Sequence, residues 1–199
     1  MKGYFKYSAL IGIFAFIANI VVAQDVYRIQ PKSSKLFVEG TSTVHDWQVE
    51  AAEFNAETKL SMNGGTISQV SDVVFITPAE GLKSGKRVMD NKIKDALKTN
   101  KHPEIKFTIN KDQTINSDKG TISGMLTIAG QSKPVDVKVD FDANNPEKFG
   151  VKGEVPLKMS AFNVEPPTAM MGTIKTGDDV VVKFDLEFQR EETRLTRSN

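Results

Sequence analysis

The sequence predicts an all-β protein in which eight or more antiparallel strands form a barrel, with one helical insertion. Apolar and polar residues alternate at period two in most segments after residue 24, and only residues 84–98 have a helical period. The clearest alternation is at residues 135–141, where three valines and a phenylalanine alternate with Asp136, Lys138 and Asp140. A strand with one apolar and one polar face is typical of an antiparallel sheet. Many such strands favour a barrel over an open sandwich, because closure removes the exposed edges.

The first 23 residues have the pattern of a secretory signal peptide. Lys2 and Lys6 precede an apolar run over residues 9–22, and Ala23 places a small residue before a cleavage position at Gln24. The run is shorter than the ~20 residues that a membrane-spanning helix needs. We therefore expect cleavage after Ala23, a periplasmic product and no transmembrane anchor. The predicted organisation is a signal peptide over 1–23, a barrel domain over 24–190 and a disordered polar tail over 191–199.

Composition argues against several classes of function. The chain has no cysteine, which removes disulfides, thiol nucleophiles and cysteine metal sites. Its net charge is +1, and beyond Ala23 acidic residues exceed basic ones by one, so nothing favours nucleic acid. The motifs of serine hydrolases, phosphate loops and zinc proteases are absent. We therefore expect no enzyme, no metal and no cofactor.

In the first half of the chain the expected strands cover residues 26–29, 36–39, 47–50, 53–62 and 66–77. Asn63, Gly64 and Gly65 form a turn signal between the last two of these strands. The period then changes, and apolar residues recur at i, i+4, i+7 and i+8 from Met89. This spacing predicts an amphipathic helix over 84–98, which ends before Pro103.

In the second half the expected strands cover residues 105–109, 122–128, 135–141, 149–157 and 180–188. Turns are expected at 116–120, 129–134 and 144–146, where glycine, asparagine or proline gathers. Residues 159–179 have no clear period and contain Pro166-Pro167 and Met170-Met171.

The apolar faces of these strands permit two interpretations. They carry Trp47, Phe54, Phe107, Phe141, Phe149, Phe184 and Phe188. An eight-stranded barrel is just wide enough for side chains to fill it or for one small ligand. The large apolar residues therefore form either a packed core or the wall of a cavity. His45, next to Asp46, is expected to be a loop histidine with a local hydrogen bond, since neighbouring strand residues face opposite ways.

Several segments together resemble one family. Residues 124–135, Gly-Met-Leu-Thr-Ile-Ala-Gly-Gln-Ser-Lys-Pro-Val, are similar to the hairpin G-x-L-T-[IL]-x-G-x-[ST]-x-P-V of the YceI-like family, the secreted bacterial polyisoprenoid-binding proteins. Residues 101–107, Lys-His-Pro-Glu-Ile-Lys-Phe, resemble the family's segment after its helix. Residues 34–40 resemble its first long strand, and residues 40–47 resemble its following loop.

The resemblance implies an eight-stranded, lipocalin-like antiparallel barrel with a helical insertion. It also implies that the barrel holds an isoprenoid or fatty-acyl chain, and that a homodimer is plausible for this architecture. The expected ligand contacts are the apolar residues Trp47, Phe54, Ile105, Phe107, Leu126, Ile128, Phe162, Met170, Met171, Val182 and Phe184. Of these, Phe162, Met170 and Met171 are expected at the mouth, because methionine adapts to varied apolar ligands.

One segment departs from the family. Many members have arginine-x-x-phenylalanine-glycine where this chain reads Lys-Met-Ser-Ala-Phe-Asn-Val-Glu-Pro-Pro over 158–167. A contact between that segment and a ligand head group is therefore not carried over. Two alternatives stay open: a solid barrel that acts as an interaction or stress-response module, and an enzyme acting on a small lipid-like substrate.

Overall fold

The computed structural model describes residues 24–115 and 117–191. The predicted signal peptide and residues 192–199 of the predicted tail lie outside the described residues. None of the described helices is long and apolar enough to cross a membrane. The strands are β1 Asp25–Ile29, β2 Lys35–Ser42, β3 Trp47–Ala51, β4 Asn55–Asn63, β5 Thr66–Pro78, β6 Leu82–Lys83, β7 Glu104–Thr108, β8 Gln113–Thr114, β9 Lys119–Ile128, β10 Gln131–Asn145, β11 Lys148–Lys158, β12 Thr168–Ala169 and β13 Ile174–Arg190. The helices are α1 Arg87–Leu97 and four short 3-10 helices, η1 Pro31–Ser33, η2 Ala79–Gly81, η3 Met159–Phe162 and η4 Met170–Gly172.

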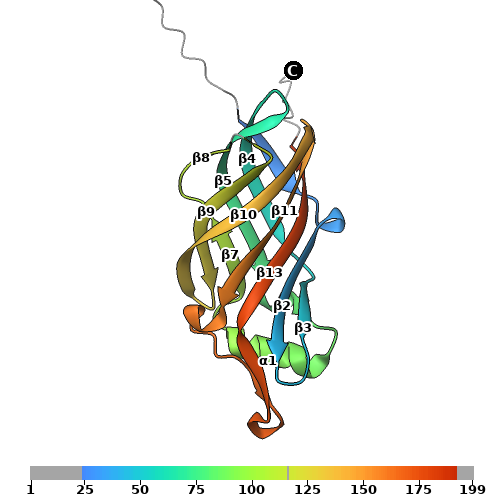
Figure 1. The fold of residues 1–199 in the computed structure, drawn as a ribbon, viewed down its shortest axis with the longest axis vertical. Helices are drawn as coiled ribbons and strands as arrows, with labels where there is room; N and C mark the ends of the chain where they lie inside the picture. The colour runs from blue at the N-terminus through green and yellow to red at the C-terminus, as the bar shows by residue number, and fades with distance from the viewer. Residues whose placement is uncertain (1–23, 116, 192–199) are drawn as a thin grey trace, which may run out of the picture.

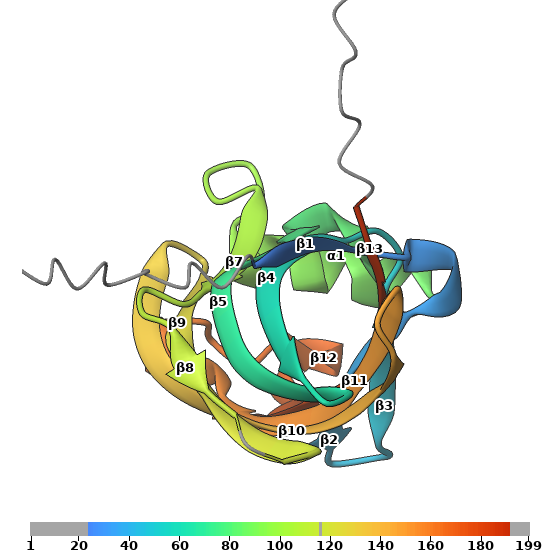
Figure 2. The same cartoon turned by 90° about the horizontal axis from the view of Figure 1, so that it is seen from above.

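Eight of these strands close into an antiparallel barrel, which confirms the predicted fold class. The order around the ring is β1, β4, β5, β7, β9, β10, β11 and β13. The ring closes because β13 pairs back with β1, where Phe188 lies opposite Ile29. Figure 2 looks along the barrel and shows the strands as a continuous wall.

The wall of the barrel differs between its two ends, because β13 has two successive partners along one side. Residues 188–190 of β13 pair with β1, whereas residues 176–185 pair with β2. β3 and β6 continue the sheet from β2. In Figure 1, α1 lies at this end, and the hairpin of β12 and the start of β13 projects beyond the helix. One end is therefore a ring of eight strands, and the other is bounded by β2, β3, β6 and α1.

The hairpin of β9 and β10 has a tighter turn than the sequence predicts. The turn is the two-residue segment Ala129–Gly130, with φ of 49° and 79°. Two left-handed residues match the twist of the flanking strands, so β10 starts at Gln131. Pro134, expected in the turn, lies within β10. Its missing N–H is tolerated because β10 pairs with β11 only from Lys138 onward, which leaves the edge free on that side.

Other boundaries also differ from the prediction. The helix begins at Arg87 rather than at residue 84, because Gly85 has a φ of 74° that lies outside the helical region. The backbone N–H and the hydroxyl of Ser84 instead donate to Asp90 Oδ1, at 2.8 and 2.6 Å. These hydrogen bonds lower the pKa of the Asp90 carboxyl. β13 begins at Ile174, inside the segment without a clear period, since its first residues pair with β12.

Candidate functional site

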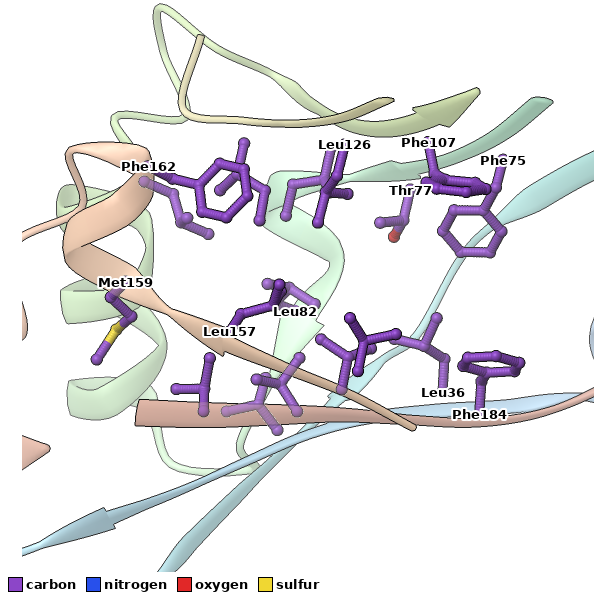
Figure 3. Close-up of a pocket in the computed structure, with 18 of the residues that line it drawn as sticks. Leu36, Phe75, Thr77, Leu82, Phe107, Leu126, Leu157, Met159, Phe162 and Phe184 are labelled. Carbon is purple, nitrogen blue, oxygen red and sulfur yellow. The ribbon is translucent and has the colours of Figure 1, made fainter. Parts of the chain in front are cut away.

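An apolar cavity of about 650 Å³ lies inside the barrel and extends from the β1–β13 closure to α1. In Figure 3, Leu36, Phe107, Leu126 and Phe184 point from facing walls into the same space. The volume lies within the roughly 300–1,000 Å³ that is typical of small-molecule sites. The barrel is therefore partly hollow rather than filled by its own side chains.

Aromatic rings close the cavity at the β1 end. Phe149 stacks on Phe188 with ring centroids 4.8 Å apart, and Tyr27 meets Phe149 edge-on at 5.3 Å. Phe141 packs beside them, 6.4 Å from Phe149. The Tyr27 hydroxyl donates to the carbonyl oxygen of Pro146 at 2.8 Å, and burial raises the pKa of this phenol. This end of the barrel is solid, so the opening lies at the other end.

The deep wall of the cavity offers methyl groups and rings to a ligand. Its threonine hydroxyls donate to backbone carbonyls, Thr58 to Ser71 at 3.1 Å and Thr77 to Glu53 at 2.7 Å. Among the described residues, no Asp or Glu side chain lines the cavity. In the same part of the chain, no group of three or more His, Cys, Asp or Glu residues is placed to hold a metal ion. The chemistry that this wall supports is apolar contact.

The α1 end of the cavity is open and carries basic side chains. Those that line it are His45, Lys86, Lys92 and Lys158. The ammonium of Lys92 donates to the carbonyl oxygen of Thr168, which ties α1 to the loop across the opening. His45 Nδ1 lies 2.9 Å from the carbonyl oxygen of Asp46, which is the local hydrogen bond expected for this histidine. An amphiphile whose apolar chain fills the cavity would place its head group among these residues.

Most of the predicted ligand contacts lie on the cavity wall. Those that line it are Trp47, Ile105, Phe107, Leu126, Ile128, Phe162, Val182 and Phe184. Phe54 is not a lining residue; it lies in the loop before β4, where its ring stacks on Phe75 with centroids 5.9 Å apart. Met170 and Met171 are exposed beyond the opening and follow the lining residue Ala169.

Other lining residues were not among the predicted contacts. The helix supplies Met89, Ile93 and Ala96, and β10 supplies Val135, Val137 and Val139. Their periodicity is plain in the sequence, since three of them share one face of the predicted helix and three share the apolar face of the best-defined strand. The periodicity alone does not show that both faces border the same cavity.

Three cavity-lining aromatic rings lie flat against glycines of neighbouring strands. A Cβ at Gly40 would lie 2.7 Å from Trp47 Cε2. A Cβ at Gly124 would lie 2.5 Å from Phe107 Cε2, and one at Gly153 would lie 2.6 Å from Phe184 Cζ. Aromatic rings that cover a glycine in this way stabilise a strand position that has no side chain to pack. Because the rings lie against the wall, the space in the middle of the barrel stays open.

Substitution of Gly153 tests this arrangement. The new methyl group of Gly153→Ala would meet both Phe184 and the carbonyl oxygen of Lys138, a backbone atom that has little freedom to move. We expect unfolding free energy to fall by about 1–3 kcal/mol, the usual cost of overpacking, as measured by urea denaturation. The matched control is Gly150→Ala on the same strand, where the nearest atom to a Cβ is 3.6 Å away. Equal stability of the two variants would show that the packing of Phe184 does not require a glycine at position 153.

Comparison with known proteins identifies relatives of this architecture. The model of the YceI-like domain matches residues 27–188, whereas no curated protein matches the chain. Among solved structures, Burkholderia cenocepacia BcnA is similar with a TM-score of 0.67 and 21% identity, over 80% of this chain and 98% of that one. A polyisoprenoid binding domain from Saccharophagus degradans, implicated in plant cell wall breakdown, has a TM-score of 0.61 and 12% identity over 83% and 98%. The Campylobacter jejuni YCEI protein has a TM-score of 0.59 and 22% identity over 72% and 84%.

Proposed function

The chain belongs to the YceI-like domain family, and from this premise we propose that it binds a lipid with a long isoprenoid or fatty-acyl chain in the barrel cavity. The observation that carries the proposal is the apolar cavity of about 650 Å³, closed by rings at one end and open at the other. The eight predicted contacts on its wall, together with the cavity face of α1, would touch the chain. A head group would remain near the basic side chains at the opening.

The physical chemistry of such a site favours affinity without strict selectivity. Each buried methylene contributes ~0.8 kcal/mol, although ordering a flexible chain leaves drug-sized ligands nearer ~0.3 kcal/mol per atom. An apolar wall also distinguishes poorly between chains that differ by one carbon. We infer that the protein sequesters or carries a class of lipids rather than one molecule. Among the described residues, no Asp or Glu lines the cavity to pair with a base, and the proposed role involves no covalent step.

Export to the periplasm is part of this proposal. Its support is the signal-peptide pattern of residues 1–23. The solid-barrel alternative is less well supported, since its premise was a barrel filled by side chains and the cavity is open. The enzyme alternative would require a reactive residue group at the opening, where the imidazole of His45 contacts the carbonyl oxygen of Asp46.

Lipid extraction tests the proposal directly. Protein purified without detergent is extracted with organic solvent, and the extract is analysed by mass spectrometry against a total lipid extract of the same cells. We expect one class of long-chain lipid, enriched in amounts comparable to the protein. The intact mass of the same protein preparation should correspond to a chain that begins at Gln24 if the signal peptide is removed. Absence of any enriched lipid, with no binding of added isoprenoid or fatty acid, would overturn the lipid-binding role.

A further inference from the structure

Exposed apolar side chains gather around the opening of the cavity. Within the described residues, the large apolar side chains that are exposed are Val44 (62%), Val74 (37%), Val88 (73%), Met170 (72%) and Met171, which is fully exposed. Val88 itself lines the cavity at the start of α1. Val44 lies between the lining residues Ser42 and His45, and Met170 directly follows Ala169. All but Val74 therefore belong to the rim of the opening.

The two methionines lie in a strained stretch of backbone. Met170 and Met171 have φ of 51° and 55°, a left-handed conformation that residues other than glycine rarely adopt. Strain of this kind persists where the surrounding structure imposes it, and it gathers at functional sites. The hairpin that carries them is fixed at its base, since Thr43 N–H donates to the carbonyl oxygen of Lys175 at 3.0 Å. The same bond joins the Met170 loop to the loop that carries Val44.

Basic side chains accompany the apolar rim. Lys86 and Arg87 immediately precede Val88, and Lys175 follows the methionine loop. All three are exposed, and none of them forms a salt bridge within the described residues. Apolar side chains flanked by Lys and Arg are the composition of a surface that lies in the boundary between lipid head groups and acyl chains. The positive charge complements anionic lipid specifically.

We propose that the open end of the barrel docks on an anionic lipid bilayer, with Val44, Val88, Met170 and Met171 entering the head-group boundary. In this position the opening faces the acyl chains, so a lipid passes between bilayer and cavity without exposure to water. Transfer of a lipid rests on the proposed function, whereas docking does not, because the rim residues lie outside the cavity wall except for Val88.

Vesicle flotation of the purified protein tests the proposal. The vesicles contain phosphatidylethanolamine with phosphatidylglycerol, and phosphatidylcholine alone provides the uncharged comparison. We expect the protein to float with the anionic vesicles and to be released as salt is raised. A variant with both Met170→Glu and Met171→Glu should bind at least about tenfold more weakly, because two apolar anchors are lost and two negative charges are added.

The matched control is Val74→Glu, which adds a charge at the exposed valine outside the rim and should leave vesicle binding unchanged. Melting curves of all variants check that they fold. Equal flotation of wild type and the methionine variant, or no flotation of wild type, would overturn the docking proposal. So would a dimer in sedimentation that the methionine substitutions abolish, since the rim would then bind a second copy of the chain. Extracted lipid without flotation would refute docking alone. Flotation with no extracted lipid and no binding of added isoprenoid or fatty acid would refute the lipid-binding role alone.

Discussion

Phe149→Ala should be the most destabilising single substitution in the barrel wall, lowering unfolding free energy by about 3–5 kcal/mol. Phe149 is 3% exposed and stands at the centre of the aromatic cluster that closes the cavity. Its ring stacks on Phe188 at an interplanar angle of 4° and receives the edge of Tyr27 at 73°. Truncation removes the buried ring and also leaves a space that its partners fill only partly, and both effects destabilise the fold.

Urea denaturation followed by circular dichroism measures this loss. Phe149→Leu should lose much less stability, because most of the apolar volume remains. Val74→Ala, an exposed valine on the outer wall, should stay within about 0.5 kcal/mol of wild type. If Phe149→Ala lost no more unfolding free energy than Val74→Ala, the stacked rings would not be what stabilises this end of the barrel.

Most of the fold can be predicted from the sequence, because the outer face of the barrel is exposed to solvent and the inner face is not. Each strand carries an apolar face toward the interior and a polar face toward solvent, so period two marks both the strands and their inward residues. The alternation over 135–141 identifies four residues that all line the cavity, Val135, Val137, Val139 and Phe141. The change to a helical period likewise identifies α1 and its inward face.

The alternation of apolar and polar residues does not predict where the backbone of a strand is irregular. The pairing of β4 with β5 shifts register between Ser61 and Met62, so Ser61 is buried where the pattern places Met62 inward. Asp72 in β5 has a φ of 51°, close to another register shift. A bulge inserts one residue and moves every later side chain to the other face. The turn expected over 129–134 is only Ala129–Gly130, and its length was mispredicted for a related reason, since alanine is an unusual residue at a positive φ.

The open cavity is the part of the site that periodicity does not decide. An inward phenylalanine looks the same in the sequence whether it fills the barrel, as Phe149 does, or lies against its wall, as Phe184 does. The distinguishing signal is a glycine at an inward position of the partner strand, as at Gly153 opposite Phe184. That pairing becomes visible only when the register of the two strands is known.

Leu126→Asp should abolish most lipid binding while leaving the barrel folded. Leu126 lies on β9 opposite Phe107. Its side chain points into the cavity, between the aromatic rings at the β1 end and the opening at the α1 end. In the empty cavity the new carboxylate has room for water, but an apolar chain that fills the cavity must displace that water. Loss of hydration without a hydrogen-bond partner costs several kcal/mol, so affinity should fall by about 100-fold or more.

Titration of the protein with an isoprenoid or fatty acid, followed by tryptophan fluorescence, measures the loss of affinity. Trp47, the one tryptophan in the chain, lines the cavity and reports binding there. Leu126→Met keeps the volume and the apolar character and should bind about as wild type does. The introduced carboxyl also supplies a pH test: ligand in the cavity disfavours its charged form and raises its pKa. Binding by Leu126→Asp should therefore recover as the pH falls, whereas Leu126→Met should show no such recovery. If Leu126→Asp bound the ligand at neutral pH as tightly as wild type, the ligand chain would not pass β9. The cavity would then not be the lipid site.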